Sequence, residues 1–141
     1  DLTLLTSEAR AFAGPVLTRL RQLVLKRGKH LPDMPDDERH ELRIALKNLR
    51  YAIEFFGSLF GNGKGVRDFL RMVADLQEDL GIHNDSVTAE SFIGTLDVAN
   101  NAEMQFAAGY LLGYYRHATI AADTHLSKKW KNFRRATAFW A

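Results

Sequence analysis

The sequence feature that most limits the fold is a regular apolar repeat between residues 66 and 87. Apolar residues recur there every three or four positions, and His83 fills the one remaining slot; they are Val66, Phe69, Val73, Leu76, Leu80 and Val87. This spacing keeps one apolar face along an α-helix, so it predicts a single long amphipathic helix that starts near Val66. Gly81 and Asn84-Asp85 are poor helix-interior residues, and we therefore expect a distortion near "GIHND".

Three further segments show helical spacing, roughly residues 3–27, 35–60 and 101 to the C-terminus, and no segment indicates a convincing strand. Gly14-Pro15 interrupts the first segment, and we expect a kink or a new helix start there because proline lacks an N–H. The glycine-rich "GNGKG" ends the second segment. With 141 residues, 46% of them apolar, the chain can form one core. The predicted fold is all-α, a single domain over residues 1–141 built as an antiparallel bundle of four to five long helices.

Net charge is only +2, but the charges are segregated along the chain. Residues 126–141 hold five cations and no acid, whereas residues 67–97 hold seven acids and two cations. Such segregation creates local fields that the small net charge conceals. The chain has no cysteine, which excludes disulfides and favours a reducing compartment such as the cytoplasm. No apolar run approaches the roughly 18–20 residues of a membrane span. Because the first residue is Asp1 rather than Met, we expect a fragment or one part of a longer protein.

The stretch "HELRIALKNLRYAIEFF" places His40, Arg43, Lys47 and Arg50 at steps of three, four and three. At about 100° per residue these four side chains share an arc of about 80°, separate from the leucine face of the same helix. Cations stacked in this way repel one another without a partner, and the arginine fork suits phosphate oxygens. We interpret this basic row as a binding surface for a phosphate-rich polyanion; an ordinary solvated helix face is the alternative.

Two weaker rows have similar spacing. Lys128, Lys131 and Arg135 lie three and four residues apart, and Arg19 and Lys26 lie seven apart. If the helices that carry them are neighbours, the rows could line one groove together with the first row. Simple solvation explains these two rows equally well.

Other chemistry is sparse. His117 and His125 lie two turns apart but lack a third ligand at metal spacing, and "GNGKG" lacks the spacing of a nucleotide-binding loop. No Ser-His-Asp or Cys-His arrangement is visible. The sequence therefore predicts no catalytic residue, no metal site and no cofactor.

The row itself resembles the signature of the CHAD domains, the conserved-histidine α-helical domains. His40, Arg43, Lys47, Arg50, Tyr51 and Glu54 match the family pattern, and "LQEDLGIHNDSVTA" and "WKNFRRATAFW" resemble later family elements. The resemblance covers about Asp36 to the C-terminus. It implies binding of inorganic polyphosphate in a basic groove, in the cytoplasm and on polyphosphate granules. Tyr51 and Glu54 are then expected to support the site, and Asp85 to pair with an arginine of the row.

The family fold contains two pseudo-symmetric helical bundles, each with such a helix. This chain holds one motif, resembling the second family repeat, so we expect one half of that fold. A homodimer is one way to supply the missing face.

Three other functions stay open on sequence alone. Nucleic-acid binding needs exposed aromatic residues beside the row. A phosphohydrolase needs a carboxylate cluster for a metal near the cations. A protein scaffold would use the acids of residues 68–97 to neutralise the row internally.

Overall fold

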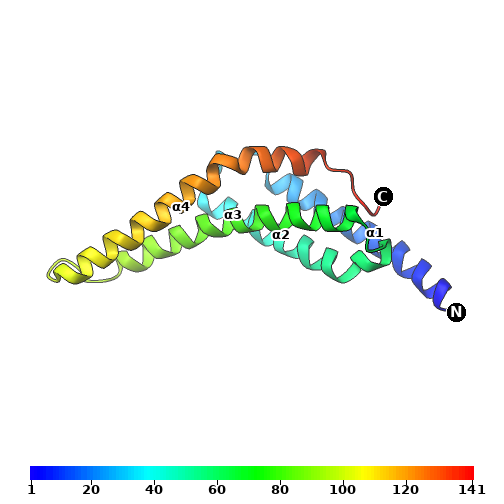
Figure 1. Ribbon diagram of the computed structural model, residues 1–141, viewed down its shortest axis with the longest axis horizontal. Coiled ribbons are helices and arrows are strands. Elements are labelled where there is room, and N and C mark those ends of the chain that lie inside the picture. The colour runs from blue at the N-terminus through cyan, green and yellow to red at the C-terminus, as the bar shows by residue number, and fades with distance from the viewer.

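The computed structural model describes all residues 1–141 and consists of helices without a strand. Its elements are α1 (Leu2–Arg27), α2 (Asp36–Phe56), the short 3-10 helix η1 (Gly57–Phe60), α3 (Lys64–Gly94) and α4 (Ala102–Arg135). Each long helix packs on the next one along the chain, α1 on α2, α2 on α3 and α3 on α4. The predicted all-α helical bundle is confirmed (Figure 1).

Neither α1 nor α3 is broken where the sequence contains poor helix-interior residues. α1 runs without a break through Pro15, and α3 runs without a break through Gly81 and Asn84-Asp85. The residues around them explain why: Ala13 and Leu17 are fully buried on either side of Pro15, and Leu80 and Ser86 are buried around the second site. Tertiary packing thus outweighs the local cost of a poor helix residue.

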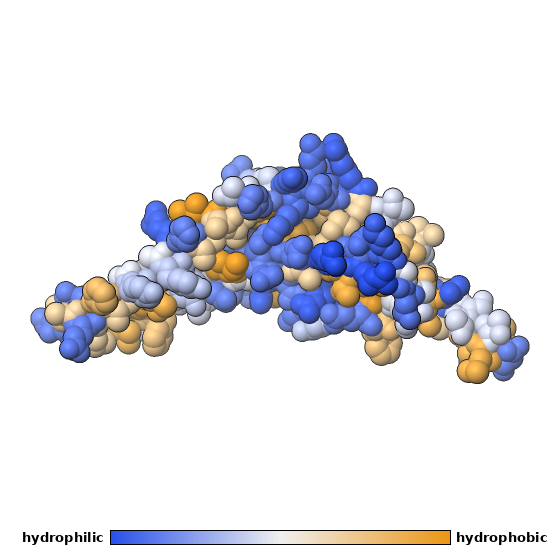
Figure 2. Space-filling model, viewed as in Figure 1, coloured by the Kyte–Doolittle hydropathy of each residue, from blue (hydrophilic) through white to orange (hydrophobic).

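The core lies between the two ends of the long axis, which the start of α1 and the connection from α3 to α4 occupy (Figure 1). Its largest fully buried side chains come from every helix; they are Leu17, Val24, Leu42, Leu46, Leu49, Ile53, Phe69, Val73, Leu76, Leu80, Leu126 and Phe133. The leucine face of α2 is therefore the buried face, as its spacing predicts. On the hydropathy surface, hydrophilic residues cover the central body and hydrophobic atoms gather at both ends (Figure 2).

The last residues differ from the prediction that the fourth helix reaches the C-terminus. α4 ends at Arg135, and the tail folds back over the body. Trp140 is buried there, with its ring 5.0 Å from that of Phe69, and its Nε1 donates a hydrogen bond to Thr18 Oγ1 at 3.0 Å. Burying this indole against α1 and α3 stabilises the tail more than another helical turn into solvent would.

Candidate functional site

A groove of about 570 Å³ lies between α2 and α3 at the position of the basic row. Arg43 and Arg50 line it from α2. The α3 side is formed by Ala74, Gln77, Glu78, Gly81, Ile82 and Asp85. The leucine face of α2 is buried, so the row is turned along the seam between the two helices rather than into the core.

Arg43 lies on the backbone of α3 at Gly81. A Cβ atom at position 81 would be 3.3 Å from Arg43 Nε, so a glycine lets the half-buried guanidinium pack closely. Arg43 makes no ion pair, and its Nε has no hydrogen-bond partner although water does not reach it. The other two guanidinium nitrogens of Arg43 make no protein hydrogen bond either, and because the side chain lines the groove they are the donors free to bind an incoming anion.

Arg50 and Lys47 complete the middle of the row. Arg50 Nε donates to Glu54 Oε1 at 2.9 Å within the same helix, and this fixes the direction of the guanidinium. Its other two nitrogens make no protein hydrogen bond. Lys47 is half-buried, makes no ion pair and lies one turn from each arginine on α2. Glu54 thus has the supporting contact expected of it, whereas Tyr51 is 56% exposed.

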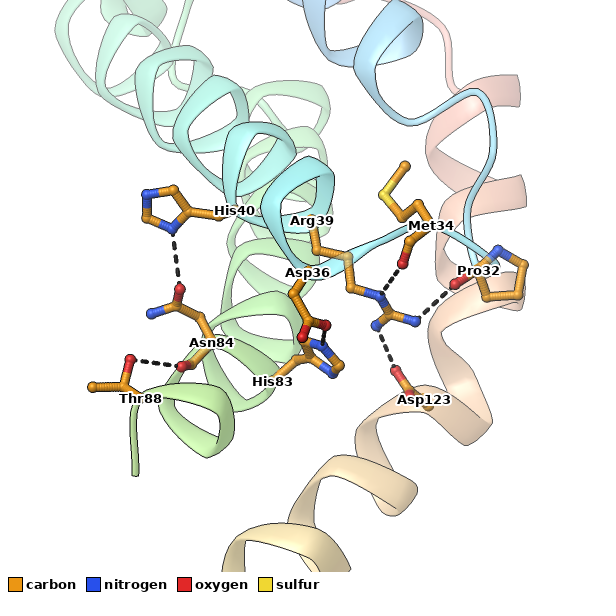
Figure 3. A network of polar contacts seen from close by, with 9 residues as sticks. All are labelled: Pro32, Met34, Asp36, Arg39, His40, His83, Asn84, Thr88 and Asp123. Carbon is orange, nitrogen blue, oxygen red and sulfur yellow. Dashed lines mark hydrogen bonds and ion pairs between the residues drawn. The ribbon is translucent and has the colours of Figure 1, made fainter. Parts of the chain in front are cut away.

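His40 opens the row and has a defined hydrogen bond. Its Nδ1 lies 3.0 Å from Asn84 Oδ1 on α3 (Figure 3). Since an amide oxygen only accepts, Nδ1 carries the proton and donates it. In neutral His40, Nε2 is therefore an acceptor, and it cannot form a hydrogen bond with a phosphate oxygen, which is also an acceptor. Once the ring is protonated, Nε2 becomes a donor toward an anion.

The start of α2 is held by contacts that the sequence did not reveal. Arg39 is buried and bonds three partners: Asp123 Oδ1 on α4 at 3.0 Å, and the carbonyl oxygens of Pro32 at 2.7 Å and Met34 at 3.4 Å. On the other side of the helix end, His83 Nε2 on α3 lies 2.6 Å from Asp36 Oδ1 (Figure 3). Together these contacts fix α2 against α3 and α4. The burial of Arg39 could not be predicted, because no periodicity in the sequence distinguishes it from an exposed arginine.

Arg21 on α1 was missed for the same reason. It donates to the Ala136 carbonyl at 2.6 Å, and its guanidinium lies over the Phe69 and Phe133 rings at 5.6 and 5.8 Å. Burial lowers the pKa of Arg21 from its ordinary value, yet an arginine stays charged throughout the physiological range. Its role is structural, since it ties the end of α4 to α1.

The acids of α3 do not neutralise the row. Glu78 and Asp85 line the groove without forming an ion pair, so the expected pairing of Asp85 with an arginine of the row is not formed. Buried Asp79 instead accepts from Lys129 on α4 at 2.7 Å. The neutralisation by α3 acids that a scaffold would require is therefore absent, and the one ion pair of the row is that of Arg50 with Glu54 of the same helix.

The two weaker rows lie elsewhere. Lys131 and Arg135 line a separate cavity of about 440 Å³ with Leu31 and Trp130, and Lys128 is exposed beside it. Arg19 borders an apolar cavity on α1, and Lys26 is exposed without a partner. These cavities share no residue with the groove, because α2 packs between α1 and α3 while α4 packs on α3. One common groove does not form.

The groove helices also carry the match to known proteins. The model of the CHAD domain matches residues 3–94, from α1 to the last residue of α3. The chain belongs to the CHAD domain family. The matched range starts earlier than Asp36 and leaves out the closing segment Trp130–Trp140. No curated protein and no solved structure gives a significant match to this CHAD chain.

The CHAD chain contains neither a metal-binding cluster of side chains nor a helix that could cross a membrane. It has no group of three or more His, Cys, Asp or Glu side chains placed to hold a metal ion. None of its helices combines the length and apolar character that crossing a bilayer requires.

Proposed function

We propose that this CHAD chain binds inorganic polyphosphate in the groove between α2 and α3, without catalysing a reaction on it. The observation that carries the proposal is the Arg43 guanidinium, which lines the groove beside Arg50 and has no protein partner. Family membership supports the same function, since the residues of the row lie inside the matched range.

The side chains of the row have different parts in this proposal. Arg43 and Arg50 lie two helical turns apart, about 10 Å along the axis, and each offers paired N–H groups to a different phosphate of one chain. Lys47 supplies a mobile positive charge between them. His40 adds a donor when it is protonated, and Asn84 holds its ring in place.

The test is a binding titration with long-chain polyphosphate on the wild type and on the double variant Arg43→Ala/Arg50→Ala. Loss of two charge-assisted contacts should weaken binding at least about a hundredfold, since each contributes roughly 1.5–3 kcal/mol. Lys29→Ala/Arg71→Ala removes the same charge from exposed positions outside the groove and should bind like the wild type. Equal losses in both variants would point to a diffuse charge effect and overturn the site.

Single-stranded nucleic acid is a second candidate because two aromatic side chains flank the row on α2. Tyr51 is 56% and Phe55 78% exposed, and bases stack on exposed aromatic rings. If RNA is the ligand, Tyr51→Ala/Phe55→Ala should weaken RNA binding at least about fivefold, since stacking contributes about 1–3 kcal/mol per base. If polyphosphate is the ligand, the same variant should bind it normally, and long polyphosphate should displace labelled RNA.

The proposed cellular place is the cytoplasm, on polyphosphate granules. A fluorescent fusion should concentrate on granules, and Arg43→Ala/Arg50→Ala should spread evenly through the cell. An evenly spread wild-type fusion in granule-rich cells would contradict this placement.

A further inference from the structure

The last part of α3 and the first part of α4 form an arm that extends beyond the rest of the bundle (Figure 1). We define the arm as residues 87–121, and none of them is buried. Helices in water gain most of their stability from packing an apolar face, so two long helices without a core need a further surface to pack on.

The arm part of α4 is apolar on two opposite sides. One side, which includes Ala108, Tyr115 and Ala118, is half-buried against α3. At about 100° per residue, the opposite side holds Phe106, Tyr110, Tyr114 and Ile120 within an arc of about 120°. We call these four residues the outer face; they are 77%, 72%, 63% and 61% exposed. A helix that is apolar on both sides normally lies between two neighbours, and here one of them is missing.

Two glycines lie at the same side of α4. Gly109 and Gly113 each cost the helix about 1 kcal/mol relative to alanine. Within the chain nothing explains them, because a Cβ atom at either position would meet no atom within 4 Å. A second helix that approaches the outer face closely would use the space that their missing side chains leave.

The charge distribution along α4 indicates which helix would pack on the outer face. Residues 102–115 carry one acid, Glu103, and no cation, whereas residues 116–135 carry six cations and one acid. An antiparallel copy of α4 sets Glu103 and the cation-free end of one helix beside the cationic end of the other, whereas a parallel copy sets the two cationic ends side by side. The register that places Glu103 near Lys131 also places Tyr114 opposite Ile120 and Gly113 opposite Ala121.

We propose that the outer face is a self-association surface, on which a second copy of this chain packs its own α4 antiparallel around a two-fold axis near His117. Such an isologous contact is closed and uses the same residues of both copies. Covering the exposed parts of four large side chains on each copy removes on the order of 1,000 Å² from water, the size at which a specific interface becomes stable. This surface is separate from the groove, so the inference does not depend on the proposed ligand.

The first test is the mass of the chain in solution by sedimentation velocity over a concentration series. The wild type should be a dimer, and Phe106→Glu/Tyr110→Glu should be a monomer with unchanged helix content by circular dichroism. Leu4→Glu/Leu5→Glu changes two equally exposed apolar residues at the start of α1 and should stay dimeric. The proposal is overturned if the wild type is a monomer, even one that binds another protein. It is also overturned if the outer-face change leaves the dimer intact.

The second test examines direction and register, and it profits from the absence of native cysteine. His117→Cys lies at the proposed axis and should give a covalent dimer with a short bis-maleimide. Glu103→Cys, exposed at the start of α4 and about 40 Å from its copy in the antiparallel arrangement, should not, whereas parallel helices would place its two copies side by side. Equal crosslinking of both variants would contradict the antiparallel arrangement.

Discussion

Gly81 controls how closely the Arg43 side chain can pack on α3. In Gly81→Ala the new Cβ would lie 3.3 Å from Arg43 Nε, so the guanidinium must shift by a few tenths of an ångström. Alanine also favours the helix by up to about 1 kcal/mol. We expect polyphosphate affinity to fall about threefold or more, while the free energy of unfolding stays equal or rises, as measured by titration and urea denaturation. Gly65→Ala, which makes only ordinary contacts, should leave affinity unchanged.

His40 contributes at the start of the row, where the hydrogen bond between its Nδ1 and Asn84 Oδ1 holds the ring in place. His40→Ala should weaken polyphosphate binding, but less than Arg43→Ala does, in titrations at constant salt. An affinity of His40→Ala equal to that of the wild type would exclude His40 from the contact.

Arg39 makes the contacts that anchor the start of α2 to the rest of the bundle. Arg39→Ala removes the partner of Asp123 and the donors to two loop carbonyls, so the free energy of unfolding should fall by about 1–3 kcal/mol in urea denaturation. Arg27→Ala breaks an ion pair with Glu41 whose partners are 44% and 47% exposed, and should cost about 0–1 kcal/mol. Equal effects of the two changes would mean that Arg39 does not anchor the helix.

The helices were predictable because their apolar periodicity is local information. The sequence also placed His40, Arg43, Lys47 and Arg50 on one side of α2, separate from its buried leucine face, and the structure agrees. No new helix starts at Pro15 and no break forms near Gly81, since propensity alone does not include the packing of the residues around them. The glycine judged to be a helix defect is instead the contact surface of Arg43.

What could not be predicted depends on which helices become neighbours. The rows of Arg19 and Lys26 and of Lys128, Lys131 and Arg135 lie at cavities or surfaces apart from the groove, because the order of packing separates them from α2. The buried positions of Arg39 and Arg21 likewise arise only when distant segments meet. The unburied arm also becomes apparent only in three dimensions, since its apolar spacing resembles that of a core helix.

For the whole molecule, the central claim is that Arg43 and Lys47 have no carboxylate partner, and that Arg50 keeps two free guanidinium nitrogens beside Glu54, until a polyphosphate binds. The most direct measurement is the slope of log affinity for polyphosphate against log salt concentration, for the wild type and for Arg43→Ala/Arg50→Ala. Bound phosphates release counterions, so each lost contact lowers the slope by about one. We predict a steep wild-type slope that becomes shallower by about two in the double variant. A wild type without salt dependence, or equal slopes in both proteins, would contradict the claim.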